Sequence, residues 1–254
     1  MATTAQYKPN VQIASDSENL AHQAVQLFVS AALDAIRSRD RFCVAISGGR
    51  TPERFFKLLA VAPDAQSLAW ENVHVFWVDE RYVPPDSPDS NYRLAADTFL
   101  RKVALPPENI HRIATEYEDI GEAALAYEQT LREVFGLRDG RTPEFDLIVL
   151  GMGADGHTAS LMPNSRTMFN VHDLVCPVHV SGGGFNRVTL TPQVLLAAKR
   201  LVVLVSGQEK AQTLKEVLTG EPDEVKYPIH VLWPALNKIV WLVDRDAASR
   251  LIRE

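Results

Sequence analysis

Short runs of consecutive apolar residues alternate along this chain with stretches in which apolar residues return at helical spacing. The runs are rich in Val, Ile, Phe and Trp, and several lack the in–out alternation of a half-exposed strand. This pattern is typical of parallel strands that are covered on both faces. It predicts strands at Phe42–Ile46, Val73–Val78, Phe145–Leu150, Leu174–Val180, Leu201–Val205, Ile229–Trp233 and Ile239–Val243. Helical patterns predict helices over about 16–38, 52–60, 90–103, 120–135, 192–198 and 208–218, with a last helix from near Asp244.

This alternation predicts an α/β fold, with a Rossmann-like, mostly parallel sheet and helices on both faces. Ser15 and Glu18 have the spacing of a capping box, which favours Ser15 as the N-cap of the first helix. Residues 1–10 are interpreted as a tail or a lead-in to a first strand, and residues 62–67 and 136–143 as loops. We see no repeat, linker or low-complexity block, so we expect one domain over residues 1–254.

Composition narrows the class of protein. Of the 254 residues, 46% are hydrophobic and 23% are charged, which indicates a globular chain with a sizeable core and excludes a disordered one. The net charge of −6 disfavours nucleic acid and anionic membranes as partners. We find no apolar run near the ~18 residues of a membrane span. Cys43 and Cys176 fit no disulfide framework, and no histidine spacing suggests a metal site, so we expect a metal-free protein in a reducing cytoplasm.

Four loops of unusual composition each follow a predicted strand. They are Ser47–Pro52, Asp79–Arg81, Gly151–His157 and Ser206–Lys210. In an open parallel sheet, the carboxyl ends of the strands meet at one edge, and ligands bind outside that edge. The four loops are therefore expected to form one site.

The first of these loops has the features of an anion site. Gly48 and Gly49 expose backbone N–H groups without an intervening side chain. Thr51 is a plausible N-cap and Pro52 fits a first helical position, so a helix N-terminus is predicted to point at the loop. Such an end attracts phosphate through its free amides and dipole. An ordinary, well-capped strand-to-helix turn would use the same residues, so both interpretations stay open.

The third loop carries the best candidate for acid–base chemistry. Residues Gly151–Gly156 have the G-x-G-x-x-G spacing of dinucleotide-binding turns, but Pro163 follows too soon for a helix, so NAD and FAD are disfavoured. A tight turn that presents Asp155 and His157 fits better. Histidine titrates near neutral pH, and Asp155 could orient its ring or favour its charged form. The alternative is a solvated loop histidine.

Basic residues near the other loops are candidates for binding a phosphate or carboxylate. Arg81 follows an apolar strand and could bind such a group bidentately, with Asp79 or Glu80 holding it or contacting substrate hydroxyls. A solvated strand end would show the same charges. Arg187 and Lys210 are either further basic partners or plain surface charges.

Taken together, these segments resemble the 6-phosphogluconolactonase family from about residue 10 to the end. The first loop is similar to the family's Ser-Gly-Gly-Ser-Thr-Pro, with Arg50 in place of the second Ser. The other resembling blocks are Asp79–Pro84 with Ser90–Tyr92, Gly151–Pro163 and Arg187–Thr191. The family's usual proline-rich lead before the last block is replaced here by residues 182–186. Arg50 either adds a charge for the phosphate or points to solvent.

The resemblance implies an enzyme that hydrolyses 6-phospho-D-glucono-1,5-lactone to 6-phosphogluconate without a cofactor, the second step of the oxidative pentose phosphate pathway. It implies the three-layer fold shared with glucosamine-6-phosphate deaminase and ribose-5-phosphate isomerase. Carried onto this chain, it makes His157 the general base, assisted by Asp155. The implied substrate- and phosphate-binding residues are Ser47, Gly48, Gly49, Arg50, Thr51, Asp79, Arg81, Asn91, Gly153, Arg187 and Lys210. We expect a monomer or weak homo-oligomer.

Two other functions are alternatives to the lactonase. A glucosamine-6-phosphate deaminase resembles this chain in the Asp-Gly-His block, but its following segment is similar to Ile-Ala-Phe-Asn-Glu-Pro. Here Met162 stands in place of that Glu and cannot do acid–base chemistry. A sugar-phosphate sensor of the same fold usually carries a DNA-binding module, for which this acidic chain has no evident segment.

Overall fold

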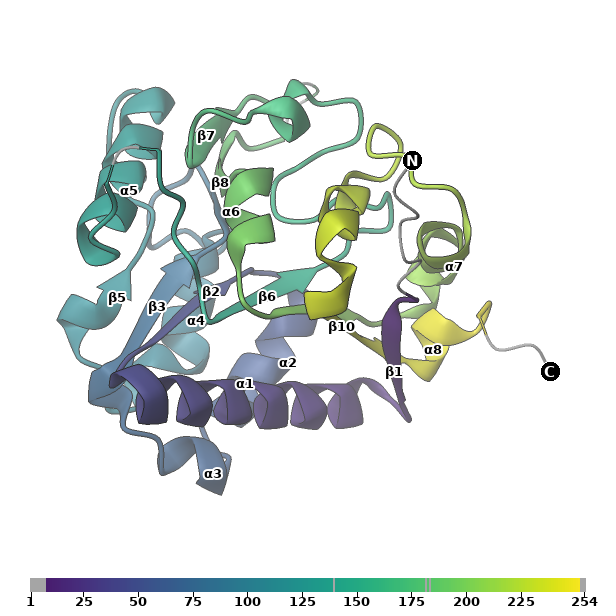
Figure 1. Ribbon diagram of the computed structural model, residues 1–254, viewed down its shortest axis with the longest axis horizontal. Helices are drawn as coiled ribbons and strands as arrows, with labels where there is room; N and C mark the ends of the chain where they lie inside the picture. The colour runs from purple at the N-terminus through teal and green to yellow at the C-terminus, as the bar shows by residue number, and fades with distance from the viewer. Residues whose placement is uncertain (1–7, 139, 181, 183, 252–254) are drawn as a thin grey trace.

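A seven-stranded parallel sheet forms the centre of the molecule (Figure 1). The structure is a computed structural model that describes residues 8–138, 140–180, 182 and 184–251. The strand order is β1-β10-β9-β6-β2-β3-β5, and every neighbouring pair is parallel. The strands are β1 Asn10–Ala14, β2 Phe42–Ile46, β3 Val73–Trp77, β5 Ile110–His111, β6 Leu147–Gly151, β9 Leu201–Val205 and β10 Ile239–Asp244. The predicted α/β class is confirmed.

Helices cover both faces of this sheet. In Figure 1, α1, α2 and α4 lie below it, while α5 and α6 lie above it. The α-helices are α1 Ser17–Arg39, α2 Arg50–Leu59, α3 Pro63–Gln66, α4 Asn91–Thr98, α5 Ile120–Val134, α6 Pro192–Ala197, α7 Ala211–Thr219 and α8 Arg245–Ala248. The 3-10 helices are η1 Trp70–Asn72, η2 Leu100–Lys102, η3 Pro107–Asn109, η4 Arg166–Phe169, η5 Gln208–Lys210 and η6 Pro228–Lys238. All residues of β2 and β9 are buried, as their unbroken apolar runs predict.

A second, antiparallel sheet has the order β4-β8-β7, with β4 Asp79–Arg81, β7 Val175–Val178 and β8 Arg187–Leu190. It corrects two expectations. The sequence predicts a loop at residues 79–81, and it predicts a strand at 174–180 within one mostly parallel sheet. A three-residue charged strand has no apolar period to identify it, because its pairing depends on β8, far along the chain. The small sheet stays close to the large one, since Leu190 N donates to Val78 O at 2.8 Å.

Two predicted helix N-caps differ from the structure by one or two residues. The N-cap of α1 is Asp16 rather than Ser15, because the Asp16 carboxylate accepts from Asn19 N at 2.8 Å. Ser15 Oγ instead donates to Asp16 at 2.8 Å. A carboxylate and a hydroxyl are comparable caps, so the sequence pattern alone did not separate the two neighbours.

Helix α2 starts one residue before Thr51, which is therefore not its N-cap. The cap is Gly49, whose φ of 109° is a conformation that other residues rarely adopt. The chain thus enters the helix at Arg50 and places Pro52 within the first turn. Among the described residues, no side chain caps this helix start.

The strand predicted at Ile229–Trp233 is wrong, because these residues lie in the 3-10 helix η6. A short, fully buried apolar run looks the same in a strand and in a buried helix. Pro228 and Pro234 decide the outcome, since proline fixes φ near −65° and donates no ladder hydrogen bond.

Smaller differences concern segment ends. The strand expected at Phe145–Leu150 begins at Leu147, and α3 forms within the loop expected at residues 62–67. The helix expected over 90–103 is divided into α4 and η2. Residues 1–7 of the expected N-terminal tail lie outside the described residues, as does residue 183 in the glycine-rich lead before Arg187.

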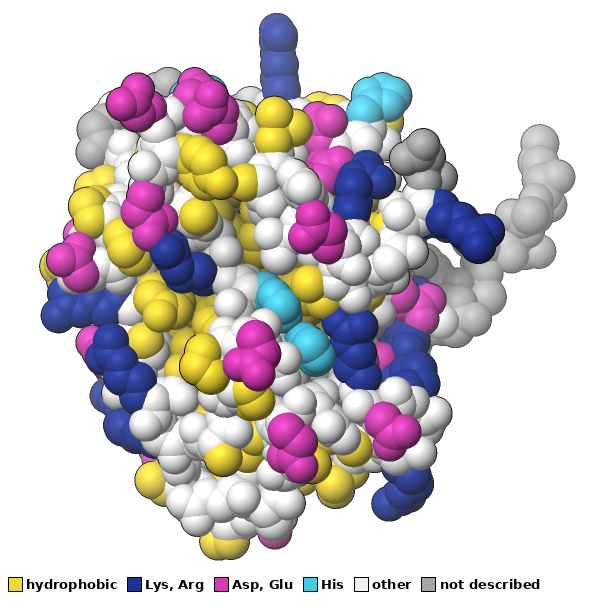
Figure 2. All heavy atoms as spheres, turned by 90° about the vertical axis from the view of Figure 1, so that its left-hand side faces the viewer, with side chains coloured by type: hydrophobic (Ala, Val, Ile, Leu, Met, Phe, Trp, Pro, Cys, Tyr) yellow, Lys and Arg dark blue, Asp and Glu magenta, His cyan; other side chains and the backbone are white. Residues whose placement is uncertain are grey.

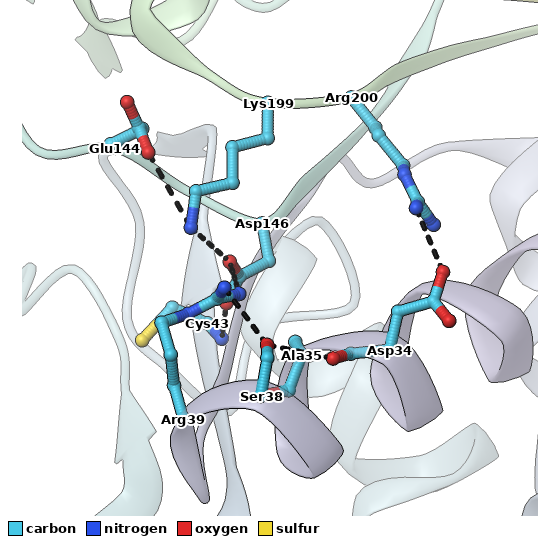
Figure 3. Close-up of polar contacts among 9 residues, drawn as sticks. All are labelled: Asp34, Ala35, Ser38, Arg39, Cys43, Glu144, Asp146, Lys199 and Arg200. Carbon is cyan, nitrogen blue, oxygen red and sulfur yellow. Dashed lines mark hydrogen bonds and ion pairs between the residues drawn. The ribbon is translucent and has the colours of Figure 1, made fainter.

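A polar network fastens the amino ends of the central strands (Figure 3). Asp146, only 8% exposed, accepts from Arg39 Nη2 at 2.6 Å and from Lys199 Nζ at 2.9 Å through Oδ1. Its Oδ2 accepts from the backbone N–H of Cys43 at 2.9 Å. One carboxylate therefore joins the end of α1 to the starts of β2 and β6 and to the segment before β9. We refer to these contacts as the Asp146 network.

A histidine pair lies near the same amino ends, at the edge of the sheet formed by β5. His74 Nδ1 in β3 lies 3.0 Å from His111 Nε2 in the edge strand β5, with the two rings within 7° of parallel. Burial, with the positive charge of Arg41, lowers the pKa of both histidines to about 4.

Figure 2 views the molecule from its left side in Figure 1 and shows charges of both signs scattered among hydrophobic side chains. In the described part of the chain, no helix combines the length and apolar character needed to cross a membrane.

Candidate active site

The loops after β2, β3, β6 and β9 line one cleft of about 520 Å³. Their predicted convergence at the carboxyl edge of the sheet is confirmed. The cleft brings together Ser47, Gly48, Gly49, Arg50, Thr51, Asp79, Arg81, Asn91, Gly153, His157, Arg187 and Lys210. Asp155 does not line it but lies directly behind His157. The residues proposed from the sequence for catalysis and for substrate binding therefore all line this cleft, except Asp155, which contacts His157.

The loop after β6 is a tight turn that presents the imidazole of His157. His157 Nδ1 lies 2.6 Å from Asp155 Oδ1, and the same oxygen accepts from the His157 backbone N–H at 3.2 Å. The hydrogen bond to His157 is the main reason that the pKa of Asp155 is below its usual value. The imidazole is 34% exposed, so it is accessible from the cleft while it stays hydrogen-bonded.

Glycine is required at position 153 by close packing. A Cβ there would lie 2.2 Å from His157 Nδ1 and 2.6 Å from Asp155 Oδ1. The turn is closed by Gly153 N donating to His157 O at 2.9 Å and Gly156 N donating to Gly153 O at 3.1 Å. The glycine at position 153 thus lets the backbone pass close to the imidazole. In a dinucleotide-binding turn, by contrast, the glycines let the backbone approach the pyrophosphate.

A second close approach joins the loop after β2 to α4. A Cβ at Gly48 would lie 2.0 Å from Asn91 Oδ1, so the Asn91 side chain occupies the space that any other residue would need. Asn91 Nδ2 donates to the backbone oxygen of Asp79 at 2.9 Å. Ser47 Oγ, Asn91 Oδ1 and Arg187 Nε are buried and have no hydrogen-bond partner among the described residues. All three residues line the cleft.

Asp79 forms the acidic part of the cleft floor. Its Oδ2 accepts from Ser160 Oγ at 2.6 Å and lies 3.9 Å from Arg187 Nη1. Burial lowers the pKa of Arg187, which the negative charge of Asp79 partly opposes. Asp79 and Arg187 therefore form a buried pair that presents both charges to the cleft.

Glu80 has a role that the sequence did not indicate. Its carboxylate accepts from the backbone N–H groups of Arg81, Asn91 and Tyr92 at 2.7–2.8 Å, and from Ser90 Oγ at 3.1 Å. Burial nevertheless raises the pKa of Glu80 to about 7. Glu80 thus binds the start of α4 rather than the Arg81 guanidinium, whose Nη1 donates to Asp89 O at 2.8 Å.

The rim of the cleft beside α2 and α7 is basic. The Arg50 side chain is 92% exposed, and its Nη2 lies 3.7 Å from a Glu209 carboxylate oxygen. Lys210 is more enclosed, and burial lowers its pKa. Arg54 also lines the cleft, although the sequence analysis does not name it as a candidate. Its position one helical turn after Arg50 was the available signal, because residues four apart share a helix face.

Nothing in this site has the form of a metal centre or a cysteine nucleophile. Across the described ranges, no group of three His, Cys, Asp or Glu side chains is arranged to hold a metal ion. Cys43 and Cys176 are buried free thiols, and burial raises their pKa values to about 11 and about 12. Such thiols are poor nucleophiles.

A cleft at the carboxyl edge of a parallel sheet, with an imidazole–carboxylate pair facing basic side chains, defines an α/β enzyme site. Comparison with known proteins identifies the group. Residues 15–241 match the family described as glucosamine-6-phosphate isomerases/6-phosphogluconolactonase, and the chain belongs to this family.

Individual relatives indicate which enzymes of this family the chain is similar to. The chain is 36% identical over 244 residues to a 6-phosphogluconolactonase of Nostoc sp., covering 96% of this chain and 99% of the relative. It is 37% identical to the one of Synechocystis sp., covering 96% and 98%. The solved 6-phosphogluconolactonase of Thermotoga maritima is 30% identical, with a TM-score of 0.78 and coverage of 93% and 100%. A solved monomeric glucosamine-6-phosphate deaminase, 23% identical with a TM-score of 0.78, shares the fold. The chain is an enzyme of the lactonase type.

Proposed function

We propose that this enzyme hydrolyses 6-phospho-D-glucono-1,5-lactone to 6-phosphogluconate, as a step of the oxidative pentose phosphate pathway. The observation that carries the proposal is the 2.6 Å contact between His157 and Asp155 at the wall of a cleft with a basic rim. The substrate comes from the names of relatives that align over nearly the whole chain.

His157 acts as the general base. Because Nδ1 is bound to the Asp155 carboxylate, its proton stays there and Nε2 keeps a lone pair. Nε2 removes a proton from water, and the resulting hydroxide attacks the lactone carbonyl carbon. The tetrahedral intermediate then expels the ring oxygen, which takes the proton from the imidazolium. Asp155 stabilises the imidazolium between these steps, much as a carboxylate does in a catalytic triad.

The substrate's phosphate binds at the start of α2, beside Arg50, Arg54 and Lys210. Free N–H groups of the first helical turn and the positive end of the helix dipole favour a dianion there. Burial lowers the pKa of Lys210, and a bound phosphate dianion would act in the opposite direction. Backbone N–H groups of the glycine-rich loops stabilise the developing oxyanion.

The ring hydroxyls bind to the polar floor of the cleft. Ser47 Oγ, buried without a partner in the described chain, can donate or accept one hydrogen bond, and Asn91 Oδ1, buried in the same way, can accept one. Asp79 accepts another. Water is the only co-reactant, so the reaction needs no cofactor. The two free cysteines support a reducing compartment such as the cytoplasm.

The test is the decay of freshly prepared lactone, measured against its unaided hydrolysis. The unmodified protein should accelerate the decay, and His157→Ala should lower kcat by roughly 100- to 10,000-fold. His172→Ala, which removes an exposed histidine outside the cleft, is the matched control and should behave as the unmodified protein.

Two outcomes would contradict the proposal. Full activity of His157→Ala would remove this residue from its role while keeping the substrate. No acceleration by the unmodified protein, together with ammonia release from glucosamine 6-phosphate, would assign the deaminase reaction instead. A lactone without the phosphate should show a much higher KM, because it lacks the group that the basic rim binds.

A further inference from the structure

The turn that carries His157 is held in place by the last third of the chain. Thr213 Oγ1, on α7, donates to the backbone oxygen of Ala154 at 2.6 Å. Ile229 N, in η6, donates to Gly156 O at 3.1 Å. The ring of Tyr227 packs so closely against Gly156 that a Cβ there would lie 2.6 Å from it. Of the two hydrogen bonds, the one from Thr213 comes from a side chain and can be removed by substitution.

The hydroxyl of Thr213 makes a different kind of hydrogen bond from that of Thr219, the last residue of α7. Thr219 Oγ1 donates to Lys215 O within its own helix at 2.8 Å, the usual contact for a helical threonine. Thr213 Oγ1 instead crosses to the turn after β6, 59 residues away along the chain. The accepting carbonyl belongs to Ala154, the residue directly before Asp155. Any tilt of this peptide moves the carboxylate that orients the imidazole.

Position on the helix adds a second connection. Thr213 lies three residues after Lys210, which is the last residue of η5 and the N-cap of α7 and lines the cleft. Residues three apart share a helix face. The continuous segment η5–α7 therefore carries a basic group of the rim and also holds the backbone beside Asp155.

We propose that Thr213 is a positioning residue for the reaction. Its hydroxyl fixes the Ala154 peptide, and through Asp155 it sets the orientation of the His157 ring relative to the basic rim at Lys210. The inference rests on the proposed role of His157 as general base. Thr213 does not line the cleft, so it acts through the turn and not on the substrate.

Thr213→Val tests this directly, because valine keeps the shape of threonine and removes the hydroxyl. We expect kcat to fall about three- to tenfold with KM little changed, as for loss of one hydrogen bond that matters only for ring orientation. The effect is moderate because Ile229 and Tyr227 still restrain the turn. Thr213→Ser keeps the hydroxyl and should restore kcat. Thr219→Val, on the same helix, is the matched control and should leave kcat unchanged.

A Thr213→Val enzyme with the kcat of the Thr219→Val control would overturn the inference, as would failure of Thr213→Ser to restore kcat. A thermal melt of each variant checks that they are folded, and Thr213→Ala replaces the valine variant if that one is not. His157→Ala, measured in parallel, separates the two proposals. If it is inactive while Thr213→Val is normal, only the positioning role fails; if it is fully active, the base assignment itself fails.

Discussion

Substituting Gly153 by alanine should disable the imidazole while leaving the fold intact. The new Cβ would lie 2.2 Å from His157 Nδ1 and 2.3 Å from His157 Cε1, whereas ordinary contacts begin at 3.4 Å. The ring must therefore retreat by more than 1 Å. Gly153 has no positive φ, so alanine fits its backbone and the cost falls on the side chains that it displaces.

That retreat is incompatible with the contact between His157 and Asp155. Their 2.6 Å hydrogen bond would lengthen beyond ~3.5 Å, where it no longer counts as one. Asp155 Oδ1, 2.6 Å from the new Cβ, is displaced as well. A misplacement of this size at a catalytic group costs on the order of 100-fold in rate. We expect kcat to fall by about this factor and KM to change little, because the phosphate-binding rim is untouched.

The assay is lactone hydrolysis over a range of substrate concentrations, with a thermal melt of each variant. Gly151→Ala is the comparison, since its added methyl group meets no atom within 4 Å. It should keep a kcat far closer to that of the unmodified protein. A folded Gly153→Ala enzyme with kcat within about twofold of normal would refute the idea that this ring position sets the rate.

Two further predictions concern stability. Asp146→Asn should lower the free energy of unfolding by about 2–4 kcal/mol, measured by urea denaturation, because it removes the charge that the two cations of the Asp146 network share. Its kcat should stay near normal, since the network lies at the opposite ends of the strands from the cleft; an unchanged urea midpoint would contradict the assignment. Lowering the pH from about 6.5 to about 4 should also destabilise the fold. Unfolding raises the pKa values of His74 and His111 towards their usual 6.5, so the unfolded chain binds more protons across this window. The loss should be on the order of 1–2 kcal/mol per histidine after solvent screening. The double variant His74→Gln/His111→Gln should show a flatter profile, and an unchanged one would contradict the explanation.

The parts of the fold that the sequence predicted are those in which local pattern and tertiary environment agree. Strands β2 and β9 read as unbroken apolar runs because helices cover both of their faces. Helix α1 shows a clear apolar period because one of its faces packs on the sheet. Strand β4 and helix η6 could not be predicted in this way. The first is defined only by its partner β8, and in the second, prolines outweigh an apolar run that also suits a strand.

In the candidate site, too, some features follow from local sequence pattern and others depend on contacts between distant residues. The rule for carboxyl ends of parallel strands placed four loops together without knowledge of any contact. The sequence did not predict the supporting roles of Glu80, Ser160 and Thr213, because their hydrogen-bond partners are distant along the chain or belong to the backbone. Ser160, for example, contacts the Asp79 carboxylate from 81 residues away. No local spacing signals such a contact, so supporting residues of this kind become visible only in three dimensions.

The position of β1 has a consequence for how the enzyme is made. β1 is an edge strand whose one neighbour is β10, so Asn10 pairs with Val240 near the opposite end of the described chain. Among the described strands β1 is made first, and it can pair only once β10, the last of them, has been made. Pairings between such distant segments form slowly, because a long loop must close before they gain anything. Since η6 and α7 also come late, a nascent chain on the ribosome holds most of the sheet but not the complete cleft. Completion of the sheet and assembly of the site therefore both depend on the segments from α7 to β10.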